Sequence, residues 1–227
     1  MNRPQSPRPG ASPWTQMLAL ALVPALLAAL AVLSAAPASS AQEDRDRGFV
    51  PLFNGKDLTG WVTPEDKTLF TVENGEIVGR TGTEKLKKNE FLVTDKAYGD
   101  FVLKAKVKIR NGNSGIQFRS ERAPDGVVSG PQADVADDQW GLLYEERRRG
   151  MIQRYPLDKA RKLLKPDGWQ EFVITAKGDH VTIDLNGTRI IERDDPKFQK
   201  TGIIALQIHV WPKPMEVRFK DIMIKEL

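Results

Sequence analysis

The stretch Phe101-Val102-Leu103-Lys104-Ala105-Lys106-Val107-Lys108-Ile109-Arg110 decides the fold class of this chain. Its odd-numbered residues are apolar, and from Lys104 onward its even-numbered residues are basic. Successive side chains of a strand point to opposite faces, so this alternation predicts a strand over residues 100–110 that buries one face. The basic face could bind anions or could simply contact water. We adopt the second interpretation, because one face of an antiparallel sheet is commonly solvated.

Shorter segments with the same alternation lie on both sides of this strand. Asn74-Gly75 and Asn186-Gly187 each separate two of them, which predicts two tight hairpins. The apolar phase slips at Lys220-Asp221, which predicts a β-bulge, and residues 158–165 are expected to form one or two helical turns. The other expected strands cover residues 49–53, 69–73, 76–80, 90–94, 114–119, 169–176, 181–185, 188–192, 202–210 and 215–227. The pattern predicts an all-β antiparallel sandwich or barrel, with one domain over residues 49–227.

The N-terminal residues read as an export signal. Arg3 and Arg8 precede an apolar run over residues 17–36, and Ser39-Ser40-Ala41 supplies the small residues of a cleavage site. We therefore expect a signal peptide over residues 1–41, a flexible lead-in over 42–48, and export to the periplasm or the extracellular space. The alternative is an uncleaved leader that anchors the protein in the membrane, because the run is about as long as a bilayer requires.

Composition excludes several classes of function. The chain has no Cys, so disulfides, thiolate metal sites and thiol nucleophiles are impossible. The formal net charge of +4 falls to +2 without Arg3 and Arg8, and no long basic run is present, so we expect no nucleic-acid partner. The sequence contains no phosphate-binding glycine loop and no GxSxG motif, and His180 and His209 cannot form HExxH.

Residues 131–152 interrupt the alternation with a concentration of charge. They contain five carboxylates, the arginines Arg147, Arg148 and Arg149, and the aromatic residues Trp140 and Tyr144. Within this stretch Gln132 and Asp134 alternate with Ala133 and Val135, so on a strand their side chains share a face. If that face is concave, it presents an amide and a carboxylate to the hydroxyl groups of a sugar, with Trp140 or Tyr144 as the platform for the ring. On a convex face the same two side chains would meet only water.

Other polar residues near this stretch have more than one interpretation. Glu145 and Glu146 could belong to a solvated loop, or one could turn inward, where Arg148 or Arg149 would be its partner. Oxygen ligands from Asp134, Asp137, Asp138 and Glu145 could hold a divalent cation such as calcium, although their spacing fits no known calcium loop. His209 ends an apolar strand and is either a hydrogen-bonded strand-end residue or a binding or general-base residue.

The chain resembles the 3-keto-disaccharide hydrolase domain family, long described as a domain of unknown function in envelope and secreted bacterial proteins. The resemblance extends from Gly48 to Leu227. The segments that carry it are Gly48–Trp61, Glu73–Ile77, Asn113–Arg119, Gln132–Val135, Gly141–Glu146 with Arg148 and Arg149, Leu206–His209 and Val217–Lys225. The chain departs from the family pattern at Val210-Trp211, where small residues are expected, and at Arg147, which extends the arginine pair to three.

The resemblance implies a concanavalin A-like jelly roll and cleavage of glycosides oxidised at sugar C3. A C3 ketone acidifies the C2 hydrogen, so a base can remove it, the C1 substituent can leave, and water can add afterwards. We expect the base to be Asp134, Glu146 or His209, with Arg148, Arg149 or a cation at the developing oxyanion. The expected substrate-binding residues are Gln132, Trp140, Tyr144, Glu145, Arg148 and Arg149.

Three alternatives remain open from the sequence. A conventional pair of carboxylates could act as acid and base on an unoxidised glycoside. The domain could instead be a non-catalytic carbohydrate-binding module of the cell envelope, or a purely structural envelope domain, because a fold does not determine a function.

Overall fold

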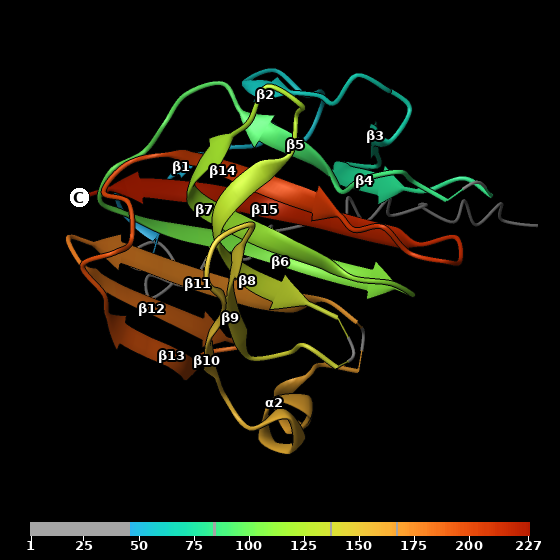
Figure 1. Ribbon diagram of the computed structural model, residues 1–227. Coiled ribbons are helices and arrows are strands. Elements are labelled where there is room, and N and C mark those ends of the chain that lie inside the picture. The colour runs from blue at the N-terminus through green and yellow to red at the C-terminus, as the bar shows by residue number, and fades with distance from the viewer. Residues whose placement is uncertain (1–45, 84, 137, 167) are drawn as a thin grey trace, which may run out of the picture. The chain divides into compact units, whose positions relative to one another are not determined.

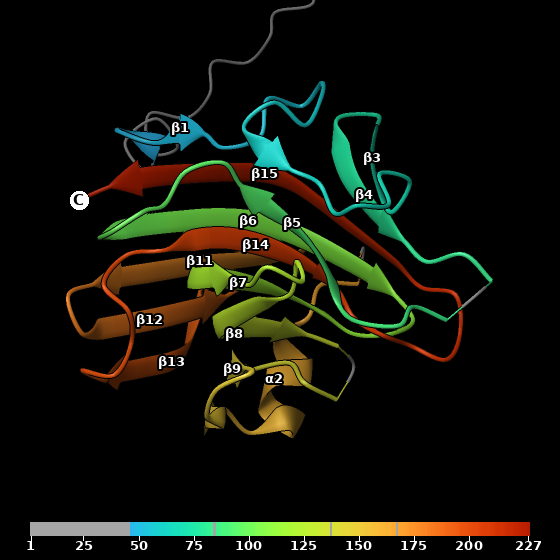
Figure 2. The ribbon, with the colours of Figure 1, turned by 45° about the horizontal axis from the view of Figure 1, so that its top comes forward.

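The computed structural model describes residues 46–227 except residues 84, 137 and 167, and they form two antiparallel sheets packed face to face (Figures 1 and 2). The first sheet has the order β13-β12-β11-β6-β15-β4-β3, with β1 paired to β15. Its strands are β1 (Val50–Pro51), β3 (Phe70–Glu73), β4 (Glu76–Arg80), β6 (Phe101–Arg110), β11 (Gln170–Lys177), β12 (His180–Leu185), β13 (Thr188–Asp194) and β15 (Glu216–Glu226).

The second sheet has the order β10-β9-β8-β7-β14-β5-β2. Its strands are β2 (Trp61–Val62), β5 (Glu90–Thr94), β7 (Ser114–Arg122), β8 (Val128–Val135), β9 (Leu142–Glu146), β10 (Gly150–Arg154) and β14 (Ile203–Ile208). Neither sheet closes on itself, so the architecture is the sandwich rather than the barrel of the two expected forms. The expected signal peptide and residues 42–45 lie outside the described residues. Within the described part of the chain, no helix is long and apolar enough to span a bilayer.

The strand over residues 101–110 has the predicted buried face, and it lies between two other strands of the first sheet. As β6 it pairs with both β11 and β15, and Phe101, Leu103, Ala105 and Val107 are at most 2% exposed. The lysines lie on the opposite face, where Lys104 and Lys106 form ion pairs of 2.7 Å with Asp46 and Asp221 respectively. The basic row is thus part of the outer, ion-paired surface of the sandwich.

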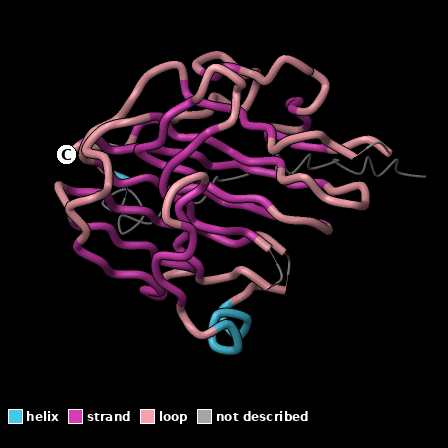
Figure 3. Tube along the Cα trace, viewed as in Figure 1, coloured by secondary structure: helices cyan, strands magenta, loops and turns pink. Residues whose placement is uncertain are grey.

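The predicted turns are confirmed by backbone geometry. Asn74-Gly75 joins β3 to β4 and Asn186-Gly187 joins β12 to β13, with positive φ at all four residues, as a two-residue hairpin turn requires. The bulge is also confirmed, because the β15–β6 register shifts after Lys220 and Asp221 has a φ of 50°. The expected helical turns correspond to α2 (Leu157–Leu163), the cyan coil at the lower edge of Figure 3.

The outer face of the second sheet is partly covered. Leu92 of β5 belongs to the main core between the sheets, whereas its neighbours Phe91 and Val93 point the other way. They form a second apolar cluster with Val127, Val128 and Ala205, all at most 3% exposed. Val127 comes from the connection between β7 and β8, so this connection folds over the part of the outer face near β5.

Arg119 of β7 connects the two sheets although its side chain is fully buried. Its guanidinium donates hydrogen bonds to the carbonyl oxygens of Gly99 (2.8 Å) and Gly178 (2.7 Å), and to Oδ1 of Asp100 (2.6 Å). These partners precede β6 and form the β11–β12 turn. A residue of the second sheet therefore satisfies backbone groups at one end of the first.

We expect Arg119→Met to lower the free energy of unfolding by about 3–5 kcal/mol, because it leaves buried carbonyl groups and Asp100 without their donor. Arg110→Met is the matched control, since the Arg110 side chain is 75% exposed and lies 3.6 Å from Glu216; its cost should stay below about 1 kcal/mol. Urea denaturation followed by circular dichroism measures both, and equal costs would contradict the assignment.

Candidate functional site

A polar hollow of about 220 Å³ lies on the outer face of the second sheet. It lies where β8, β9, the end of β14 and the turn before β7 meet. Its lining residues are Asn113, Gln132, Asp134, Gln139, Leu142, Tyr144, Glu146 and His209. The hollow thus brings together Gln132, Asp134, Tyr144, Glu146 and His209 of the residues expected from the sequence.

Alternation along two paired strands places these side chains on one face. In β8, Ala133 and Val135 are fully buried in the main core, so Gln132 and Asp134 point away from it. In β9, Leu143 belongs to the same core, and Tyr144 and Glu146 have the opposite phase. The register pairs Gln132 with Tyr144, so both strands present polar side chains to the hollow.

The face that carries the hollow is concave. Glu146 lies on β9 and Gln207 on β14, with β8 and β7 between them. Three strand spacings correspond to about 14 Å on a flat sheet. The register also offsets the two residues along the strands, because Glu146 pairs with Gly130 whereas Gln207 is in line with Gly115 and Asp134. Yet Nε2 of Gln207 donates a hydrogen bond of 3.3 Å to Oε2 of Glu146. The second sheet therefore curves toward these residues, as the sugar-binding interpretation requires, and the convex alternative does not apply.

A row of buried amides forms the floor of the hollow. Nε2 of Gln117, on β7, donates to Oε1 of Gln132 at 3.2 Å, and Nε2 of Gln132 donates to Oδ1 of Asp134. Gly115 lies beneath the Gln132 side chain, where a Cβ would collide with it. Glycine at this position thus allows Gln132 to lie flat and to reach Asp134.

Asp134 titrates near neutral pH. It is 5% exposed, and burial raises the pKa of its carboxyl to about 7. The charge of Glu146 acts in the same direction, while the hydrogen bond from Gln132 and the charge of Arg154 oppose it. A carboxyl group with such a pKa can accept or donate a proton at physiological pH, as a general base or acid must.

His209 adds a second group capable of proton transfer. Its Nδ1 lies 2.7 Å from the carbonyl oxygen of Val210, a distance at which Nδ1 donates a hydrogen bond. In the neutral ring this leaves Nε2 as the basic nitrogen. The His209 amide also donates to the carbonyl oxygen of Asn113 at 3.2 Å, which joins the two lining residues. His180 lies elsewhere, on β12, with Nδ1 2.8 Å from Asp194.

Trp140 is not a platform in the hollow. It is 3% exposed and stacks on Phe172 of the first sheet, with ring centroids 6.1 Å apart and planes inclined by 17°. The expectation failed because Trp140 lies in the turn before β9, where alternation does not indicate direction. Tyr144 is the aromatic residue that lines the hollow.

Glu145 and Arg149 lie behind the hollow rather than in it. Glu145 shares the inward phase of Leu143, is 1% exposed, and pairs with Arg149 through both carboxylate oxygens. Nη1 of Arg149 also binds Asp195 at 2.8 Å, and its guanidinium lies 5.1 Å from the centre of the Phe198 ring. Burial disfavours ionisation of Asp195, yet hydrogen bonds from Arg149 and the Lys197 amide hold its pKa below the ordinary value. An inward glutamate with an arginine partner was one of the two expected forms.

The arginine run as a whole turns away from the hollow. Arg148 pairs with Glu121 at 2.9 Å and Arg147 with Asp125 at 3.0 Å. None of the three arginines lines the hollow, so the structure does not place Arg148 or Arg149 where an oxyanion would form.

The calcium ligands considered from the sequence do not assemble as a set. Asp134 and Glu145 point to opposite faces of the second sheet, and Asp137 lies outside the described residues. Elsewhere among those residues, no group of three or more His, Asp or Glu side chains is arranged to hold a metal ion.

The amide side chains other than that of Gln132 are not identified as site residues by the sequence analysis. These are Asn113, Gln117, Gln139 and Gln207. Gln117 and Gln207 are fully buried, although they lie on the outward phase of apolar strands. A glutamine between apolar residues in a strand expected to be covered on both faces is the signal that could have identified them. Their burial depends on the curvature of the sheet, which the sequence pattern does not encode.

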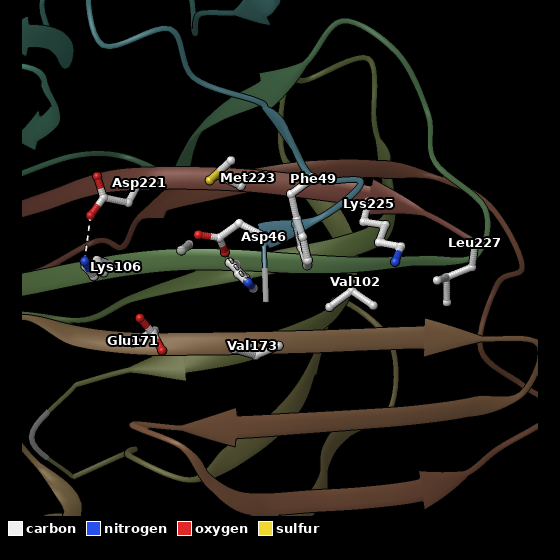
Figure 4. Close-up of a pocket in the computed structure, with 12 residues that line it drawn as sticks. Asp46, Phe49, Val102, Lys106, Glu171, Val173, Asp221, Met223, Lys225 and Leu227 are labelled. Atoms are coloured by element: carbon white, nitrogen blue, oxygen red, sulfur yellow. Dashed lines mark hydrogen bonds and ion pairs between the residues drawn. The ribbon is translucent and has the colours of Figure 1, made fainter. Parts of the chain in front are cut away.

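A larger hollow of about 630 Å³ lies on the outer face of the first sheet (Figure 4). Its acidic residues include Asp46 and Asp221, which pair with Lys104 and Lys106 at 2.7 Å. Its floor includes the apolar residues Val102, Val173 and Met223. The lysines neutralise these two carboxylates. We therefore place the candidate site in the smaller hollow, where the charge of Glu146 disfavours ionisation of Asp134.

Comparisons with known proteins agree with this architecture. A family model described as "3-keto-alpha-glucoside-1,2-lyase-like domain" matches residues 48–225, and no curated protein matches the chain significantly. A crystal structure described as a candidate glycosyl hydrolase from Parabacteroides distasonis has a TM-score of 0.59 at 23% identity, covering 82% of this chain and 97% of that one.

Two further structures have the same fold. A Bacillus licheniformis β-glucanase has a TM-score of 0.57 at 10% identity, covering 79% of this chain and 97% of its own. A carbohydrate-binding module from Bacillus subtilis has a TM-score of 0.51 at 18% identity, covering 74% of this chain and 96% of its own. At such identities the likeness establishes the fold, a concanavalin A-like jelly roll.

We expect Glu145→Gln to lower the free energy of unfolding by about 2–3 kcal/mol, because it removes a buried charge from Arg149 while Asp195 remains as partner. The control is Glu121→Gln, which removes the partner of Arg148 from an exposed pair and should cost less than about 1 kcal/mol. Equal denaturation midpoints for the two variants would show that the buried pair of Glu145 and Arg149 does not stabilise the fold.

We expect Asp134→Asn to be more stable than the wild type at pH 8 by roughly 1–4 kcal/mol. The unfolded carboxyl ionises near pH 4 and the folded one near pH 7. Between these values the unfolded chain binds fewer protons, so wild-type stability falls as pH rises and the loss is complete above pH 7. The advantage of the variant should therefore shrink toward pH 4.

Asp125→Asn is the control for this pH dependence. The Val127 amide and Arg147 lower the pKa of Asp125, so this substitution should remove stability at neutral pH rather than add it. Denaturation curves at pH 4, 6 and 8 compare the two variants. If Asp134→Asn is less stable than the wild type at pH 8, the conclusion that burial disfavours the ionised form of Asp134 is wrong.

Proposed function

We propose, since the chain belongs to the 3-keto-alpha-glucoside-1,2-lyase-like domain family, that it cleaves glycosides whose sugar is oxidised to a ketone at C3. The observation that carries the proposal is the pairing of Asp134 and Glu146 in one concave hollow, with the pKa of Asp134 raised to about 7. The hollow thus holds a carboxyl group that can take up a proton near neutral pH.

The proposed reaction begins with proton transfer to Asp134. A C3 ketone makes the C2 hydrogen acidic, and the Asp134 carboxylate removes it, leaving the electron pair as an enolate. The enolate then forms a C1–C2 double bond as the C1–oxygen bond breaks, and the departing oxygen takes a proton. Addition of water to C1 and C2 completes a net hydrolysis.

Other lining residues would assist these steps. The Tyr144 hydroxyl is a hydrogen-bond donor for the developing enolate oxygen. Glu146 and His209 are the groups available for proton transfer to and from the departing oxygen and the incoming water. Gln132 orients Asp134 through its hydrogen bond, so it positions the base rather than reacting itself.

A conventional glycosidase mechanism is the specific competitor. Two carboxyl groups share the hollow, and one of them has the raised pKa typical of a general acid. In that mechanism Asp134 would protonate the departing oxygen and no ketone would be needed. The two mechanisms therefore differ in their requirement for an oxidised sugar.

The test supplies methyl 3-keto-α-glucoside and methyl α-glucoside in parallel and measures release of methanol. We expect turnover of the keto-glycoside alone, with kcat/KM rising with pH up to about 7 as Asp134 ionises. Asp134→Asn should reduce kcat/KM by about 10²–10⁴-fold, whereas Asp125→Asn, outside the hollow, should leave it unchanged.

The remaining outcomes separate the alternatives. Equal turnover of both glycosides would favour the two-carboxylate mechanism over elimination. Binding of both without turnover, preserved in Asp134→Asn and Glu146→Gln, would favour a carbohydrate-binding module.

A further inference from the structure

Three oxygen atoms that line the hollow have no hydrogen-bond partner among the described residues. Gln132 binds Oδ1 of Asp134, and Gln207 binds Oε2 of Glu146. The other oxygen of each carboxyl group receives no hydrogen bond from the described residues. Oδ1 of Asn113 is buried and also lacks a partner in the described part of the chain. A ligand that satisfies these atoms must bring several hydrogen-bond donors.

Among the described residues, the lining contains acidic side chains but no lysine or arginine. The arginines of the adjacent turn are held by Asp125, Glu121 and Glu145. Arg154, whose charge acts on Asp134, donates its guanidinium hydrogens to Oε1 of Gln139 (2.7 Å) and the carbonyl oxygen of Asp138 (3.2 Å). No described cation is therefore directed at a ligand in the hollow.

We infer that the hollow selects an uncharged, hydroxyl-bearing sugar ring and rejects sugars that carry a carboxylate or a phosphate. This inference rests on the proposed function for the identity of the site and narrows its substrate class. A hydroxyl group donates a hydrogen to a carboxylate or amide oxygen. An anionic substituent offers only acceptors and adds a negative charge beside Asp134 and Glu146.

The size of the hollow limits the ligand further. Pockets that enclose a drug-sized ligand hold about 300–1,000 Å³, and this one holds about 220 Å³. The hollow therefore has room for about one sugar ring. The inference therefore concerns the charge of the ring that occupies the hollow.

The binding experiment compares methyl α-glucoside with methyl α-glucuronide by isothermal titration at pH 8. The two ligands differ only at C6, where a carboxylate replaces a hydroxymethyl group. For a charge about 7 Å from a carboxylate at an effective dielectric constant near 20, Coulomb repulsion weakens binding by roughly tenfold to a hundredfold. We expect the glucuronide to bind at least about tenfold more weakly.

Two variants assign this preference to the hollow. Glu146→Gln should bring the ratio of the two dissociation constants toward one, and Gln139→Lys, at the rim, should favour the glucuronide. Glu121→Gln is the matched control, because it removes an equal charge from an exposed position outside the lining, and it should leave the ratio unchanged. Circular dichroism establishes that each variant is folded.

Equal affinity of the wild type for both sugars, or a ratio that neither variant changes, would overturn the inference. The proposed function would fail differently, through absence of turnover of the 3-keto-glycoside. In that case the glucoside would still bind more tightly than the glucuronide, so each failure can be recognised separately.

Discussion

The alternation of side chains along β8 and β9 is the constraint on which the site depends. Ala133, Val135 and Leu143 are fully buried in the core, and their packing fixes which residues point outward. A slip of one residue would transfer Gln132 and Asp134 into the core and Ala133 into the hollow. The packing that stabilises the sandwich therefore also directs the side chains of Gln132 and Asp134 into the hollow.

Charge is buried on both faces of these strands, with different consequences. Behind the hollow, Glu145 and Asp195 are neutralised by Arg149, which ties β9 to the segment that follows β13. In the hollow, the Gln132 amide is the one direct hydrogen-bond partner of Asp134 among the described residues, and ionisation of Asp134 is disfavoured. The first arrangement stabilises the fold, whereas the second costs stability and provides a group that can exchange protons, as is common at functional sites.

Curvature of the second sheet converts a polar face into a site. On a flat sheet, Glu146 and Gln207 would be too far apart to bond, and the hollow would be an open surface. The amide row and Gly115 then allow Gln132 to lie against the floor. The resulting hollow is small, and its described lining includes two carboxyl groups and no lysine or arginine, which suits the oxygen-bonded hydrogens of a sugar.

The sequence by itself determined most of the strands, the two Asn-Gly hairpins, the bulge at Lys220-Asp221 and the shared face of Gln132 and Asp134. These features follow from the two-residue repeat of a strand and from local turn geometry, which depend only on neighbouring residues. It did not predict β8, β9 and β10 as strands, because the charged stretch over residues 131–152 obscures their alternation. Tertiary structure alone decided that Trp140 packs on Phe172, that Arg148 and Arg149 turn away from the hollow, and that Gln117 and Gln207 meet its residues. Each of these outcomes depends on a partner from another strand or on the curvature of a whole sheet, and no local pattern in the chain specifies either.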